Sequence, residues 1–157
     1  MAKTGVRVVV KEDSLHRSSY GSIVGVIYIA FDEQGFPEVE WSDFPVILLS
    51  WWLDAAAVFL DRPNVVTELR FMDGPFLVEA TSKGDGSLRL DCVSDASRRQ
   101  TEASFQTSAA HFCSELLKAA KTIERACIER AWQSADTLAL SRSLANLDRC
   151  LNENRGS

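Results

Sequence analysis

The sequence predicts an α+β fold in which a largely antiparallel sheet packs on helices. Three observations predict it. Residues 65–93 alternate apolar and polar side chains between turn signals, which is typical of an antiparallel meander with one covered face. Residues 43–60 are apolar almost all round a helix, and residues 108–151 carry apolar stripes at helical spacing.

Length and charge narrow the class of protein. The chain has 157 residues, of which 46% are hydrophobic and 25% charged, which is the composition of a globular protein. No linker or internal repeat divides it, so we expect one domain over residues 1–157. The net charge of −5 argues against nucleic acid as a direct partner, because phosphate binding requires an excess of basic residues.

The N-terminal part contains two predicted strands. Residues 6–11 form a short β-branched run, and residues 23–31 are apolar on both alternating faces, which indicates a central strand covered on both sides. The segment between Asp32 and Trp41 contains Gly35 and Pro37, which favour turns. Its last four residues, 38–41, have the pattern of a further short strand.

The apolar helix predicted over residues 43–60 follows a start signal. Ser42 or Asp43 can cap the first N–H groups, and Pro45 suits the first turn. A helix this apolar must be enclosed, either in the core or in a dimer interface. It is at the short limit for a membrane span and contains Asp54, so we expect no membrane partner. The N-terminus lacks a long apolar segment, so we expect no secretory signal and a cytoplasmic location.

The second half predicts a meander followed by helices. The expected strands are residues 65–72, 76–82 and 87–93, joined by turns at Asp73–Gly74 and at residues 83–86, with a polar edge strand over 99–106. Two helices are expected over 108–132, with Thr107 or Ser108 as the cap, and over 136–151. We interpret the polar face of the meander as a solvated surface with cross-strand ion pairs; it contains Glu68, Arg70, Glu79, Arg89 and Asp91.

No residue pattern predicts a cofactor, a metal site or a catalytic centre. The four cysteines are widely spaced and fall on apolar stripes, so we expect reduced core thiols; they are Cys92, Cys113, Cys127 and Cys150. His111 is two residues from Cys113, so on a helix the two side chains diverge and cannot act as a pair. We interpret His111 as a surface residue at a helix start.

Negative charge is concentrated in one short segment. Residues 1–61 contain nine acidic and four basic residues, whereas residues 62–157 contain thirteen of each. The candidate partner-binding residues are Asp32, Glu33, Glu38, Glu40, Trp41 and Asp43. Three interpretations stay open: a solvated loop, a docking patch with Trp41 as an aromatic anchor, or a carboxylate pair for catalysis or metal binding. If residues 38–41 are extended, Glu38 and Glu40 share one face.

The order of these elements resembles a known class of proteins. Strands precede the aromatic-rich stretch from Trp41-Ser42-Asp43-Phe44-Pro45 to Trp51-Trp52-Leu53, then come the meander with its Phe71-Met72-Asp73-Gly74 turn and the closing helices. This order resembles the small α+β immunity proteins encoded beside bacterial polymorphic toxins and secreted effectors. The resemblance implies a non-enzymatic inhibitor that binds a cognate toxin or effector with a basic contact surface. The alternatives are a secretion chaperone, usually a homodimer, and a small hydrolase.

Overall fold

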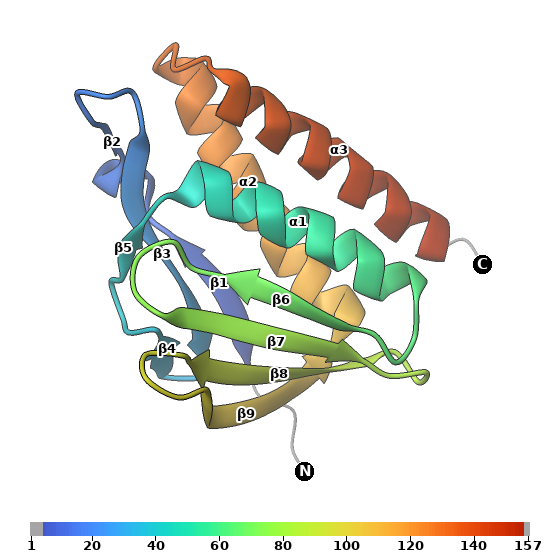
Figure 1. Cartoon of the computed structure of the whole chain (residues 1–157). Helices are drawn as coiled ribbons and strands as arrows, with labels where there is room; N and C mark the ends of the chain where they lie inside the picture. The colour runs from blue at the N-terminus through green and yellow to red at the C-terminus, as the bar shows by residue number, and fades with distance from the viewer. Residues whose placement is uncertain (1–4, 156–157) are drawn as a thin grey trace.

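The structure is a computed structural model that describes residues 5–155, and its α+β class is as predicted. Within these residues, nine strands form two antiparallel sheets, and three long helices pack beside them (Figure 1). The ends of the predicted domain, residues 1–4 and 156–157, lie outside the described residues. The same holds for part of the N-terminal segment on which the prediction about export rests.

The first sheet is built around one long strand, β3 (Ile23–Phe31), which is buried on both faces from Ile27 onward, as its sequence predicts. Four short strands pair with it antiparallel: β1 (Val6–Val10), β2 (His16–Arg17), β4 (Gln34–Phe36) and β5 (Ser42–Asp43). A 3₁₀ turn at Glu12–Ser14 joins β1 to β2.

The second sheet is the predicted meander with its edge strand. Its order is β6–β7–β8–β9, and all neighbours are antiparallel. The strands are β6 (Val66–Arg70), β7 (Phe76–Ser82), β8 (Ser87–Ser94) and β9 (Gln100–Ser108). The register of β8 and β9 shifts between Cys92 and Val93, which marks a β-bulge.

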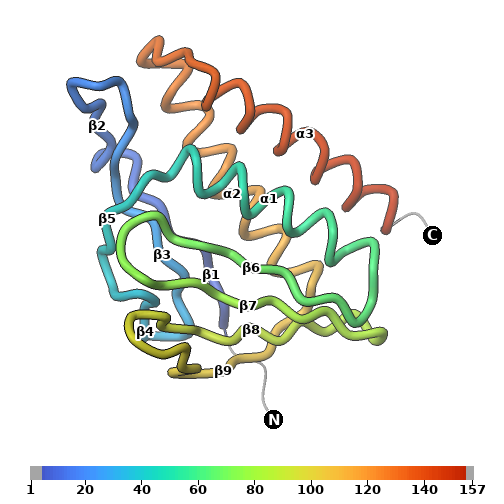
Figure 2. The backbone as a smooth tube through the Cα atoms, in the orientation of Figure 1, coloured from blue at the N-terminus to red at the C-terminus, as the bar shows by residue number. Residues whose placement is uncertain are grey.

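The helices are α1 (Pro45–Asp61), α2 (Ala109–Glu129) and α3 (Ala135–Arg155). Helix α1 lies between the meander and the other two helices, so its apolar sides are covered (Figure 2). It is therefore a core helix, with Trp52 fully buried and Trp51 47% exposed on its outer side. Ser108 caps α2 as predicted, since its hydroxyl accepts the His111 N–H. Within residues 5–155, no helix combines the length and apolarity that a membrane crossing requires.

The predicted start of the apolar helix is wrong by two residues. Helix α1 begins at Pro45, its N-cap is Phe44, and no side chain caps it. Ser42 and Asp43 instead form β5 against β3. The Asp43 carboxylate accepts main-chain N–H groups of the β6–β7 turn instead of capping the helix.

Candidate interaction surface

Asp43, one of the predicted partner-binding residues, lies inside the protein with 1% of its surface exposed. Its carboxylate accepts four hydrogen bonds, from Trp41 Nε1 (3.0 Å) and from the main-chain N–H groups of Phe44 (2.8 Å), Met72 (3.3 Å) and Asp73 (3.0 Å). Met72 and Asp73 belong to the turn between β6 and β7. Asp43 therefore fixes this turn to the first sheet and presents no charge to a partner.

Trp41, the predicted aromatic anchor, is partly buried. Its indole N–H bonds to Asp43, and its ring meets Phe76 edge to face with the centroids 5.4 Å apart. The ring contact holds the 37–41 segment against the meander, and the hydrogen bond joins it to β5. The side chain is thus engaged within the chain.

Glu38 and Glu40 lie in a turn, so the predicted strand over residues 38–41 is wrong. Glu40 has a positive φ of 66°, which extended strands do not contain. The turn folds back over β4, where a Cβ on Gly35 would stand 2.8 Å from the main-chain nitrogen of Val39. Glu40 forms an ion pair with Lys11, whereas Glu38 is exposed. The two glutamates therefore do not form a common face.

Asp32 and Glu33 form the turn between β3 and β4, and both are exposed. Asp32 has a φ of 55°, and its carboxylate accepts the Gly5 N–H at 2.9 Å. Beside this turn is a hollow of about 450 Å³ lined by Phe31, Asp32, Glu33, Gln34 and Phe105. The rings of Phe31 and Phe105 stack with their centroids 4.0 Å apart. The acids therefore lie next to an apolar contact between the two sheets.

A second hollow of about 160 Å³ continues along the same seam between β4 and β9. It adds Glu102 and Ala103 of β9 and the buried Cys92 to the lining. We define the acidic seam as Phe31, Asp32, Glu33, Glu102 and Phe105. The sequence pattern does not place Glu102 and Phe105 at this site, because only the packing of β9 against β3 and β4 brings them to the predicted acids.

The cysteines are free, as predicted, and three of the four are buried. Burial raises the pKa of Cys92 and of Cys113 to about 12, and the nearby Cys150 adds to the effect at Cys113. His111 is exposed at the start of α2, and its Nε2 lies 2.9 Å from the carbonyl oxygen of Val6. His111 therefore contacts main chain at the edge of β1.

Alkylation under native conditions is expected to separate the thiols. A thiol with a pKa of about 12 is ionised to only about one part in ten thousand at pH 8, and only the thiolate reacts. Cys150 is half-buried, so it is expected to react with iodoacetamide first. Peptide mass spectrometry over time measures the order, with urea-unfolded protein as the control. Fast native labelling of Cys113 would contradict the buried position.

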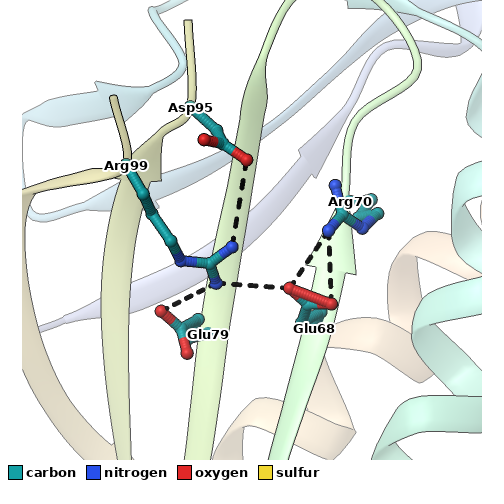
Figure 3. A network of polar contacts seen from close by, with 5 residues as sticks. All are labelled: Glu68, Arg70, Glu79, Asp95 and Arg99. Carbon is teal, nitrogen blue, oxygen red and sulfur yellow. Dashed lines mark hydrogen bonds and ion pairs between the residues drawn. The ribbon is translucent and has the colours of Figure 1, made fainter. Parts of the chain in front are cut away.

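The outer face of the meander carries a row of acids that is neutralised by arginines (Figure 3). Glu68 stands directly opposite Glu79, and Glu79 opposite Asp91. Arg99, from the segment between β8 and β9, reaches Glu68 (3.2 Å) and Glu79 (3.0 Å). The polar face is present, but the predicted pairing across strands is wrong for its arginines: Arg70 pairs with Glu68 and Arg89 with Asp91, each within one strand. The cation that joins acids of two strands is Arg99, from outside the strands.

Replacing Arg99 by alanine is expected to lower the midpoint of thermal unfolding by a few degrees. The substitution leaves Glu68 and Glu79 facing each other without a bridging cation, and like charges on opposite strands are destabilising. The effect should shrink as salt is added. Arg98→Ala, an exposed neighbour, is the control in the same calorimetric series. Equal midpoints for both variants would contradict the bridge.

Comparison of the chain with protein-family models, with curated proteins and with solved structures found no match.

Proposed function

We propose that this chain is a non-enzymatic immunity protein that binds a cognate bacterial toxin or effector through a protein–protein interface and neutralises it. The acidic seam carries the proposal. Its acids stand beside a stacked aromatic pair, so the surface combines charge with an apolar contact. Charge accelerates and orients association, whereas apolar surface supplies binding energy.

The distribution of charge supports a basic contact surface on the partner. Among the residues that the structure describes, the lining of the two hollows contains three acids, Asp32, Glu33 and Glu102, and no lysine or arginine. Such a surface attracts a basic protein over roughly 8–10 Å in physiological salt. Toxins that act on nucleic acids are basic where the phosphate binds, so this class fits the seam.

Coexpression tests the proposal. The product of the neighbouring open reading frame is produced in a laboratory bacterium with and without this chain. We expect growth arrest by the neighbour alone, growth in the presence of both, and coelution of the two purified proteins. A toxic neighbour that this chain neither binds nor neutralises would overturn the proposal, and so would a neighbour without toxicity.

A charge reversal tests the seam within that complex. Glu33→Lys is expected to slow association about tenfold at low salt, with little difference at high salt. Glu129→Lys makes the same change of charge on an exposed residue at the far end of α2, so it is the matched control. Stopped-flow fluorescence measures both rates. Equal rates for the two variants would exclude the seam from the interface.

A further inference from the structure

Strand β9 forms one edge of the meander and is the longest strand of that sheet, with nine residues. It pairs with β8 on one side, and no strand among the described residues pairs with its other side. Its ribbon lies at the lower border of the molecule, away from α1 and α3 (Figure 1). An edge of this kind presents main-chain groups that can accept another strand.

The register shows which main-chain groups point outward. The Ser87 carbonyl accepts the Lys83 N–H (2.9 Å), so Ser87 faces β7, and its pair with Ser108 is not hydrogen-bonded. Because bonded and non-bonded pairs alternate, the main-chain groups of Gln106 and Ser104 also point away from β8. Both residues are exposed. Their N–H and carbonyl groups are therefore presented at the open edge.

The other long edges are protected. Strand β6 has five residues and packs against α1. Strand β1 packs against α2. The Nε2 atom of His111 also contacts the carbonyl oxygen of Val6, the first residue of β1. Among the described residues, the helix that contacts β9 most is α2, which begins directly after it, and the sequence of β9, QTEASFQTS, contains neither lysine nor proline. Those residues are common protections of natural edges. Its protections are the bulge near Cys92 and one charge, Glu102.

The neighbouring side chains decide what can pair with this edge. In an added strand, alternate side chains would point to the same side as Phe105, over the hollow between β9 and the β3–β4 turn. There the stacked rings of Phe31 and Phe105 would contact an aliphatic stem, and Asp32 and Glu33 would attract a cationic end. Arginine and lysine side chains have both an aliphatic stem and a cationic end.

Strand β9 of a second copy of this chain does not provide such a cationic side chain. Strand β9 contains no basic residue, so a second β9 paired along this edge would place no lysine or arginine of that strand over the acidic seam. The occupant must be basic and extended. We propose that β9 accepts an extended segment of the partner protein as an additional strand, with arginine or lysine at alternate positions over the acidic seam. This proposal rests on the proposed function for the identity of the partner, but the edge can be tested alone.

The probe is a short capped peptide in which threonine alternates with arginine. We expect it to shift the amide resonances of Ser104 and Gln106 at millimolar concentration and to protect these amides from hydrogen exchange. A threonine–glutamate peptide of the same length should bind about tenfold more weakly or not at all. Unchanged Ser104 and Gln106 resonances, or equal binding of both peptides, would overturn the proposal.

Two modified peptides test strand pairing against simple charge attraction. Each is N-methylated at alternate amides, one in each phase. Because alternate amides of a strand point to the same neighbour, one phase should abolish binding and the other should leave it intact. Equal binding by both would mean that charge alone holds the peptide, and would overturn strand addition without any change to the protein.

Protein variants complete the test. Gln106→Pro removes an outward N–H without removing a hydrogen bond to β8, so an edge strand can tolerate it. It should abolish peptide binding, whereas Gln106→Thr should retain it; near-ultraviolet dichroism verifies the fold of each. A Gln106→Pro variant that still neutralises the toxin would overturn the edge and leave the function standing. If the peptide binds but this chain neutralises no product of a neighbouring open reading frame, the open edge stands and the proposed function is overturned.

Discussion

Asp43→Ala is expected to lower the free energy of unfolding by about 3 kcal/mol or more. The substitution removes a buried acceptor and leaves four N–H groups without their partner. Each unsatisfied buried donor costs roughly 1–3 kcal/mol, less whatever entering water recovers. The change also frees the β6–β7 turn from the first sheet. Urea denaturation monitored by circular dichroism measures the loss.

Two controls separate the carboxylate from its position. Asp43→Asn keeps one acceptor oxygen but brings an NH₂ group against the same donors, so an intermediate loss is expected. Asp73→Ala removes the exposed side chain of a neighbouring turn residue and should cost less than about 0.5 kcal/mol. A cost below about 1 kcal/mol for Asp43→Ala would mean that water replaces the carboxylate.

Trp52→Ala is expected to cost about 4 kcal/mol, in the range for large aromatic residues removed from a core. The ring is fully buried in α1, meets Phe71 edge to face at 5.0 Å, and donates its N–H to the Arg70 carbonyl at 2.9 Å. Its removal would leave a cavity between α1 and the meander.

The adjacent tryptophan provides a matched comparison. Trp51 is 47% exposed, so Trp51→Ala should cost about 1 kcal/mol or less. Trp52→Phe would keep most of the apolar surface and lose the hydrogen bond to Arg70, which places it between the two. Chemical denaturation of all three variants gives the order. Similar costs for Trp51→Ala and Trp52→Ala would contradict the enclosure of α1.

Local periodicity was enough to predict the longer elements and their buried sides, but it did not predict the short strands β2, β4 and β5. The stripe Phe112, Leu116 and Ile123 predicts the buried side of α2, and all three are fully buried. The alternation in 65–93 likewise predicts the meander, because period-two patterns depend on adjacent residues only. The division of the strands between two sheets depends on tertiary packing and has no such local signal.

The candidate site was harder to predict, because closeness in sequence is not closeness in space. The acids of the 32–43 segment separate: Glu40 pairs with Lys11, Asp43 turns inward, and Asp32 and Glu33 stand beside β9. Asp43 matched a helix cap by sequence, yet two of the four donors that hold its carboxylate are 29 and 30 residues away. Nothing local distinguishes the two roles.

The tie between Asp43 and the β6–β7 turn has a consequence for cooperativity. Met72 and Asp73 are exposed turn residues, whose amides would ordinarily exchange with solvent through small local openings. Here their N–H groups can open only if a buried carboxylate of the other sheet loses its partners. We therefore expect both amides to exchange far more slowly than those of an ordinary exposed turn, because opening them also breaks the contact between the β6–β7 turn and the first sheet.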